Sequence, residues 1–271
     1  MTIAAGFVFD KGVLLCADTE IETPASKNLG IKVGAFAGDW GIVAAAIAGH
    51  VDYALAAFQK LEREIVRNGP GEDLIGTIED SLATYYAENV FGHPQYQSYP
   101  EQHAYSFLLA VREEGKISRL YVTNDTVLHE IGTYRCEGVG RDVGHSAIRT
   151  LYQSGEMTED QAVAIGAYTL ATVKDNVPGC GGPSTFLIVP SVGEVYRRSE
   201  DALVLHLENV CGWFDQSARQ FLMDHMCQSE EEFGKHLLRL NSECQHIRKI
   251  WKEQLTRKAV QSTPESTIRD R

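Results

Sequence analysis

Residues 2–19 read TIAAGFVFDKGVLLCADT, and this stretch decides the fold. Two apolar runs, residues 3–9 and 12–18, are separated by the polar pair Asp10 and Lys11 and by Gly12. Apolar runs divided by so short a polar segment predict a tight antiparallel β-hairpin. The strand pattern begins directly after Thr2, so this threonine lies at the open end of the first strand.

Thr2 follows the initiator Met1. Threonine is small, so we expect removal of Met1, which leaves Thr2 with a free α-amine beside its own hydroxyl. Such a residue carries both a nucleophile and a base, and the unperturbed α-amine pKa of about 7.7–8.0 leaves it partly neutral near pH 7. A Met-Thr start is also common where it has no chemical role, so the downstream sequence has to decide.

Composition restricts the class of protein. The chain has 271 residues, 44% of them hydrophobic, and a net charge of −12. A large core is therefore possible, and an acidic surface argues against nucleic acid or an anionic membrane as a partner. No signal peptide is evident, and the longest apolar stretch, residues 41–49, is too short to cross a bilayer. The six cysteines form no CxxC pair, which predicts a reduced, cytoplasmic protein.

Periodicity changes along the chain in a regular order. Further strands are predicted at residues 32–36, 41–48, 104–112, 117–123, 127–131, 134–139, 185–189 and 194–197. Helices are predicted at residues 50–68, 72–90, 143–154, 158–177 and 233–258, the fourth opening with a capping-box spacing at Thr158 and Gln161. The last dozen residues read as a loose tail.

This order of strands, two helices, strands, two helices and strands favours two packed antiparallel sheets with helices on the outer faces. The fold class is therefore α+β, with four layers in the order αββα. We divide the chain into residues 1–198, the sandwich, and residues 199–271, a helical C-terminal extension with a flexible tail.

Several motifs together resemble those of the proteasome β-type peptidases, which are N-terminal-nucleophile (Ntn) hydrolases. The strongest is Thr2 followed at a fixed distance by GVLLCADT, residues 12–19. Lys32 matches a lysine that opens the next strand, and residues 48–52 match a Gly-containing turn before the first helix. Residues 138–140 match a G-x-G sequence before a later helix. Asp175 matches an acidic residue, and residues 180–182 match the small-Gly-Gly sequence that follows it.

The resemblance implies a role for each matching residue. Thr2 is the nucleophile, Lys32 lowers the pKa of the amine and helps the hydroxyl to ionise, and Asp18 holds Lys32. The backbone N–H of Gly49, or of its neighbour Ala48, contributes to the oxyanion hole. Asp175 and Cys180 stand where the family keeps an Asp and a Ser that support the N-terminus.

The sequence departs from the family pattern at three positions. Glu20 replaces a typical Arg, Val139 replaces a Ser within the G-x-G, and Cys180 replaces another Ser. The segment between Asp18 and Lys32 is also about two residues short, so Lys27 is a rival for the role of the lysine.

Two other kinds of site match the sequence less well. Residues 138–144 superficially match a dinucleotide-binding loop, but the third glycine is one place late and no βαβ unit surrounds it. Metal-ligand residue types also gather near the C-terminus, although their spacing fits no tetrahedral site. These are Cys211, His225, Cys227, His236, Cys244 and His246. We therefore expect no cofactor and no metal.

The favoured function is a threonine peptidase that cleaves peptides or unfolded proteins through an acyl-enzyme on Thr2. The resemblance implies assembly into a ring, as a homo-oligomer or with related subunits, and help from an ATP-dependent unfoldase. Two alternatives stay open: a non-catalytic structural subunit, and an Ntn amidohydrolase that acts on small molecules.

Overall fold

The computed structural model describes residues 2–261, apart from 24–25, 72, 95, 100–102, 153–156, 198–201 and 226–228. The chain forms two compact units, Met1–Glu208 and Asn209–Arg271. Met1, Cys227, the end of the helix predicted at 143–154 and most of the predicted tail lie outside the described residues. The division of domains after residue 198 stays a prediction.

The hairpin predicted from residues 2–19 is confirmed. β1 (Ile3–Phe9) and β2 (Gly12–Asp18) pair antiparallel, and Phe9 is opposite Gly12 across the two-residue turn. These strands lie inside a five-stranded sheet with the order β10-β1-β2-β11-β12. The remaining strands of this sheet are β10 (Tyr134–Gly138), β11 (Ser184–Pro190) and β12 (Tyr196–Arg197).

A second five-stranded antiparallel sheet lies against the first. Its order follows the chain, β5 (Val33–Gly38), β6 (Gly41–Gly49), β7 (Tyr105–Glu113), β8 (Arg119–Asn124) and β9 (Val127–Ile131). Small side chains are frequent in the core between the sheets, among them Ala4, Ala17, Ala44, Ala46 and Ala110, all fully buried. Small residues let the two backbones approach closely, so residues from both sheets can meet at one end of the sandwich.

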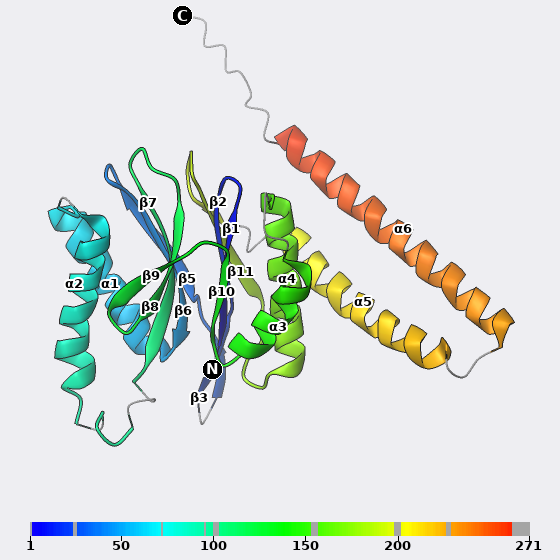
Figure 1. Ribbon diagram of the computed structural model, residues 1–271, viewed down its shortest axis with the longest axis horizontal. Coiled ribbons are helices and arrows are strands. Elements are labelled where there is room, and N and C mark those ends of the chain that lie inside the picture. Colours follow the sequence, from blue (N-terminus) through cyan, green and yellow to red (C-terminus); the bar gives the residue numbers. More distant parts are fainter. Residues whose placement is uncertain are drawn as a thin grey trace, which may run out of the picture. The chain divides into compact units, whose positions relative to one another are not determined.

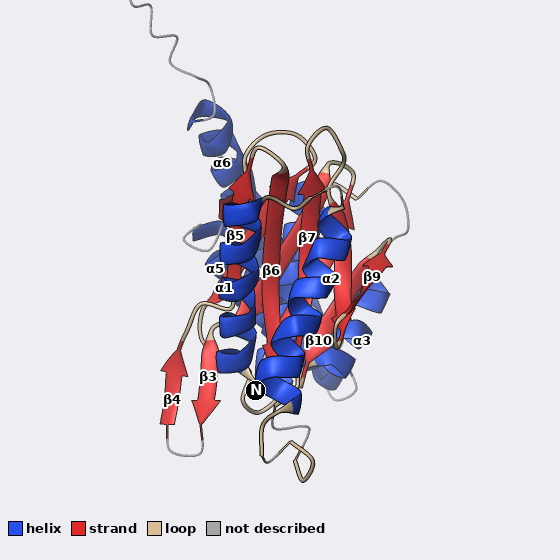
Figure 2. Cartoon of the chain, turned by 90° about the vertical axis from the view of Figure 1, so that its left-hand side faces the viewer, coloured by secondary structure: helices blue, strands red, loops and turns tan. Residues whose placement is uncertain are grey.

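Helices cover the outer face of each sheet (Figure 1). α1 (Val51–Asn68) and α2 (Leu74–Tyr85) pack on the second sheet through an aromatic-rich core, as the turned view also shows (Figure 2). α3 (Arg141–Leu151) and α4 (Glu159–Asn176) pack on the first, and α4 begins with the predicted capping box. The first unit is thus an α+β structure of helices, sheet, sheet and helices, as the sequence predicted.

Two local features differ from the sequence expectation. Residues 72–90 were predicted as one helix, but α2 ends at Tyr85 and continues as a π-helical turn, η1 (Tyr86–Phe91). The polar stretch after Asp18 forms an unpredicted two-stranded hairpin, β3 (Glu20–Thr23) and β4 (Ser26–Leu29) (Figure 2). Every residue of β4 is exposed, so the stretch lacks the apolar alternation that signals a strand.

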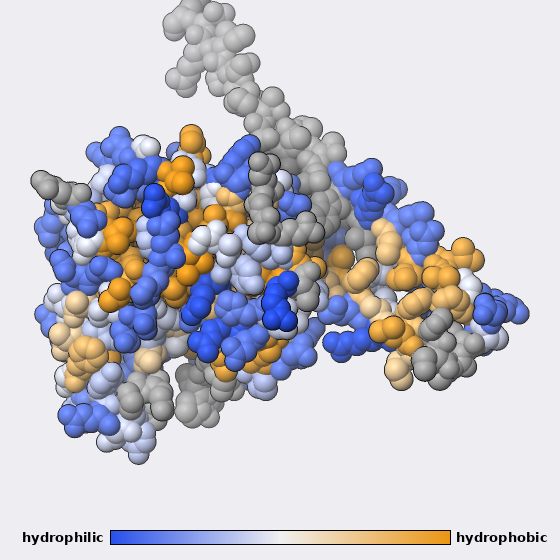
Figure 3. All heavy atoms as spheres, in the orientation of Figure 1, coloured by the Kyte–Doolittle hydropathy of each residue, from blue (hydrophilic) through white to orange (hydrophobic). Residues whose placement is uncertain are grey.

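The C-terminal region consists of two long helices, α5 (Ala202–His225) and α6 (Glu230–Gln261). Large apolar side chains are exposed on both, and they form the orange patches on these helices in Figure 3. They include Phe214, Leu222, Met223, Leu237 and Leu238. Among the described residues, no helix combines the length and the hydrophobicity that a membrane crossing requires.

Candidate active site around Thr2

Thr2 lies immediately before β1, at the end of the first sheet, and its side chain is buried with 1% of the residue exposed. Asp18 is the last residue of the paired strand β2 and is fully buried. The two-residue turn of the hairpin brings Asp18 beside Thr2 and Ile3. The Thr2 hydroxyl donates to Asp18 Oδ1 at 2.7 Å, and the Ile3 N–H donates to the same oxygen at 3.1 Å.

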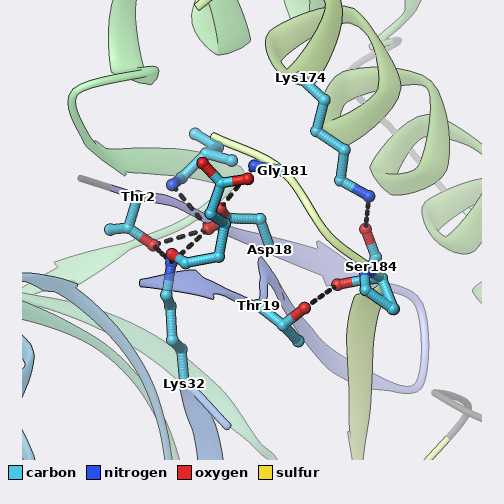
Figure 4. A network of polar contacts seen from close by, with 10 residues as sticks. Thr2, Asp18, Thr19, Lys32, Lys174, Gly181 and Ser184 are labelled. Carbon is cyan, nitrogen blue, oxygen red and sulfur yellow. Dashed lines mark hydrogen bonds and ion pairs between the residues drawn. The ribbon is translucent and has the colours of Figure 1, made fainter. Parts of the chain in front are cut away.

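Lys32 reaches this position from the second sheet. It directly precedes β5, is fully buried, and its backbone oxygen accepts a hydrogen bond from the Ile47 N–H of β6 at 2.9 Å. Its Nζ lies 2.5 Å from Thr2 Oγ1 and 2.9 Å from Asp18 Oδ1, and it also donates to the Glu20 carbonyl (Figure 4). The amine of Lys32 therefore has its acceptors outside its own sheet, at the end of the first sheet and on β3.

The electrostatics of the site follow from this burial. Asp18 and Lys32 form an ion pair whose side chains are both 0% exposed. Burial lowers the pKa of Lys32 from its ordinary value, and the neighbouring Asp18 carboxylate opposes that shift. A lysine with a lowered pKa and a direct contact to a hydroxyl can exchange a proton with it or stabilise its alkoxide.

A loop after α4 closes one side of the site. The Gly181 N–H donates to Asp18 Oδ2 at 3.0 Å, so each oxygen of this carboxylate has a donor. The preceding residue, Cys180, is buried, and desolvation followed by the charge of Asp18 raises the pKa of its thiol to about 11. The thiol stays protonated at neutral pH and is a poor nucleophile.

Gly138 approaches Thr2 from β10. Its φ of +99° lies in the left-handed region, and a Cβ there would contact the carbonyl oxygen of Thr2 and lie 3.0 Å from its Cγ2. The Gly140 N–H donates to the same carbonyl at 3.4 Å. Only glycine fits at position 138, and this steric demand explains the first glycine of the G-x-G sequence.

Several of the solved structures that this chain resembles are Anbu proteins. An Anbu (Gly-1) mutant from Hyphomicrobium sp. strain MC1 matches with a TM-score of 0.66 and 14% identity over 83% of this chain and all of the other. The Anbu ancestral beta-subunit from Yersinia bercovieri gives a TM-score of 0.65 and 14% identity over 81% and 96%.

A third match is an Anbu complex from Pseudomonas aeruginosa, described as a helical assembly, with a TM-score of 0.67 and 14% identity over 84% and 97% of the two chains. No family model matches the sequence, and no curated protein does. At this identity the likeness to Anbu shows the fold alone.

These matches correct the family inferred from the motifs. The proteasome β-type peptidases were the wrong family, because the matching structures are Anbu proteins, which are related to that family but distinct from it. The motifs at Thr2, Asp18 and Lys32 reflect the geometry of a hairpin end and a neighbouring sheet. Such geometry does not separate one family of this fold from another.

The structure separates the remaining candidate residues. Lys27 is on the exposed hairpin and pairs with Glu20 at 2.7 Å, with 61% of its side chain exposed, so Lys32 and not Lys27 contacts Thr2. Asp175 is exposed in the last turn of α4, and no contact among the described residues joins it to Thr2. The structure therefore gives Asp175 no part in this cluster.

Gly49 ends β6 with a φ of +90°, and a Cβ there would lie 2.5 Å from the carbonyl of Ala104. Its proposed role in the oxyanion hole stays a prediction. Val139 has 52% of its surface exposed and supplies no polar group. Among the described residues, no cluster of three or more metal-ligand side chains is present, and Gly138–Gly144 joins β10 to α3 within an antiparallel sheet rather than in a βαβ unit.

Sequence reasoning missed the contacts made by backbone groups. The Glu20 carbonyl holds Lys32, and the Gly181 N–H holds Asp18. A backbone group carries no residue-specific signal, so its position is known only when the fold is known. The pair of glycines at 181 and 182 was the one available sign of a close approach.

Proposed function

We propose that this chain is a threonine-type hydrolase that cleaves peptide bonds, with Thr2 as the nucleophile once Met1 has been removed. One observation carries the proposal: Thr2 Oγ1 lies 2.7 Å from Asp18 Oδ1 and 2.5 Å from Lys32 Nζ, with all three side chains buried. An ordinary threonine at a strand end does not need a buried ion pair, whose desolvation is expensive.

In the first step, the α-amine of Thr2 takes the hydroxyl proton while Oγ1 attacks the substrate carbonyl. The Lys32 ammonium stabilises the charge that develops on Oγ1, and Asp18 fixes Lys32. The Gly49 N–H donates to the oxyanion in this proposal. Collapse of the tetrahedral intermediate breaks the C–N bond, the leaving amine takes the proton, and an ester forms on Thr2. Water then attacks the ester and restores the hydroxyl.

The assembly and the substrate are part of the proposal. The Pseudomonas aeruginosa neighbour is a helical assembly, which supports an oligomer of this chain as well. An enclosed oligomer would keep such a nucleophile away from folded proteins. Unfolded polypeptides are then the substrate class, and an ATP-dependent unfoldase on another chain is a natural partner. The cytoplasmic location rests on cysteine usage, and the buried residues Cys16, Cys136 and Cys180 are in no disulfide.

The decisive test combines intact-mass analysis with a peptide epoxyketone, which forms a covalent adduct with an N-terminal Thr. We expect the purified protein to lack Met1 and to gain one probe molecule per chain. Thr2→Ala abolishes the adduct and Thr2→Ser retains it. Lys32→Met lowers the labelling rate by at least about a hundredfold, because it removes the charge at Oγ1.

Lys60→Met is the matched control, because Lys60 pairs with Glu88 at 2.7 Å on the helical layer and leaves the site untouched. Lys27→Met is the rival variant. A loss of labelling in Lys27→Met with retention in Lys32→Met would reverse the assignment of the lysine.

The same experiment separates the alternatives. Retention of Met1 in the mature protein excludes the catalytic proposal and favours a non-catalytic subunit. An adduct on Thr2 without cleavage of any peptide, together with hydrolysis of small amides, favours an amidohydrolase instead. Electron microscopy of the purified protein distinguishes a closed ring from an open helical assembly.

A further inference from the structure

A second polar cluster, formed by Lys174, Ser184 and Glu208, adjoins the proposed site, because Ser184 is paired with Asp18 across β11 and β2. Lys174 of α4 donates to Ser184 Oγ at 2.6 Å and to the two carboxylate oxygens of Glu208 at 3.0 and 3.1 Å. Ser184 donates in turn to Glu208 Oε1, and only 4% of Ser184 is exposed. The side chains of Lys174 and Glu208 are 15% and 12% exposed. The cluster joins β11, α4 and α5.

A serine beside a lysine invites comparison with a nucleophile and its base, but the contacts argue against that role. Lys174 donates to both oxygens of Glu208, which is the behaviour of an ammonium ion rather than of a proton acceptor. Ser184 in turn donates its hydroxyl hydrogen to Glu208 Oε1, a carboxylate that is itself bound by Lys174. The cluster therefore acts as a clamp and not as a second reaction centre.

The clamp holds one end of a short segment, Gly181–Ser184, and hydrogen bonds join the rest of this segment to residues at the Thr2 site. The Gly181 N–H donates to Asp18 at 3.0 Å, and the Glu20 N–H donates to the Gly181 carbonyl at 3.0 Å. The Thr19 hydroxyl donates to the Pro183 carbonyl at 2.8 Å. Figure 4 shows this segment between Asp18 and Thr19 on one side and Lys174 on the other.

The register of the sheet makes the coupling direct. Ser184, the first residue of β11, is paired with Asp18, the last residue of β2. A shift of Ser184 therefore moves the backbone that supports Asp18. The backbone of this segment is tightly packed at Gly182, where φ is +71° and a Cβ would lie 2.6 Å from Thr19 Oγ1.

We propose that Glu208 is a positioning residue for Asp18, which it holds in place through Ser184 and the backbone of Gly181–Ser184. The catalytic consequence rests on the proposed function, whereas the structural consequence does not. Glu208 is the last residue of the first unit, so only the first turns of α5, which belong to this unit, are thereby linked to the geometry at Thr2.

The test uses the full-length protein with Glu208→Gln and Ser184→Ala, and with Glu88→Gln as the matched control. Glu88 forms an ion pair with Lys60 at 2.7 Å on the other helical layer, where 60% of the Glu88 side chain is exposed. Hydrogen exchange is measured by mass spectrometry at the amide of Gly181. We expect both test variants to exchange this amide about tenfold faster than wild type, with the thermal melting of the whole chain little changed. The control should match wild type.

Peptide hydrolysis is measured on the same variants. We expect kcat to fall about tenfold with KM within about twofold, since the clamp orients the catalytic pair and does not touch the substrate. Unchanged exchange at Gly181 in both test variants would overturn the proposal, and so would equal effects of Glu88→Gln. If wild type shows no hydrolysis and no probe adduct, while exchange at Gly181 still rises in Glu208→Gln, the proposed function fails and the clamp stands.

Discussion

The buried pair of Asp18 and Lys32 permits a stability prediction that does not depend on catalysis. Both side chains are 0% exposed and their charged atoms are 2.9 Å apart. Asp18→Asn leaves the Lys32 ammonium buried without its counterion. The new amide also has to point its NH2 group at a donor, because one side of Asp18 faces Thr2 and Lys32 and the other faces the Gly181 N–H.

We expect Asp18→Asn to lower the free energy of unfolding by about 3–5 kcal/mol, the usual result of removing one partner of a buried ion pair. For a unit of this size that corresponds to a fall in Tm of about 6–20 °C. Lys32→Met leaves the Asp18 carboxylate buried without its counterion, but this carboxylate keeps donors from Thr2, Ile3 and Gly181. We therefore expect the loss of unfolding free energy in Lys32→Met to lie at the lower end of the same range. The double variant removes both charges, and the coupling energy should be at least about 2 kcal/mol.

The assay is urea unfolding followed by tryptophan fluorescence. Trp40 belongs to the first unit, whereas Trp213 and Trp251 belong to the second, so the variants are made in a background with both of the latter changed to Phe. Trp40 then reports the unit that contains the ion pair. Effects of the two single substitutions that simply add in the double variant, with an unchanged slope against urea, would refute the reasoning.

Two further predictions concern single residues near Thr2. Gly138→Ala should lower the rate of probe labelling at Thr2 by at least about tenfold, because the new methyl group contacts the Thr2 carbonyl. Gly115→Ala is its control: Gly115 also has a positive φ, +71°, but a Cβ there meets no atom within 4 Å, so it shares the backbone strain of about 1–3 kcal/mol and should label normally. Cys180→Ser should make the stability less dependent on pH between 9 and 11. The folded pKa of Cys180 is raised from 9.0 to about 11, so the unfolded chain loses the thiol proton first, and stability present below pH 9 is lost as the pH rises. Wild type should lose at most about 2 kcal/mol more than Cys180→Ser over this range in urea unfolding, and parallel pH profiles of the two proteins would contradict the assignment.

The layers of the first unit were largely readable in the sequence because periodicity is a local property. The helices and strands of the sandwich have clear hydrophobic periodicity, and the capping box that begins at Thr158 predicted the start of α4. The hairpin β3–β4 was missed because β4 is exposed along its whole length, and most residues of both strands are polar. The π-helical turn after Tyr85 was missed because its residues continue an ordinary helical pattern.

The sequence by itself determined that Thr2 and Asp18 meet. A two-residue turn at Asp10 and Lys11 leaves one register for the hairpin, and that register brings the two residues together. The sequence did not determine which lysine contacts Thr2. Lys27 and Lys32 both follow Asp18 in a polar stretch, and no local pattern predicts how many residues of that stretch form the hairpin β3–β4. Only the packing of two sheets decided for Lys32, since its partners come from the other sheet. The backbone donor at Gly181 and the clamp at Glu208 likewise depend on segments more than 150 residues from Thr2. Such contacts follow from how whole layers pack, which no short stretch of sequence encodes.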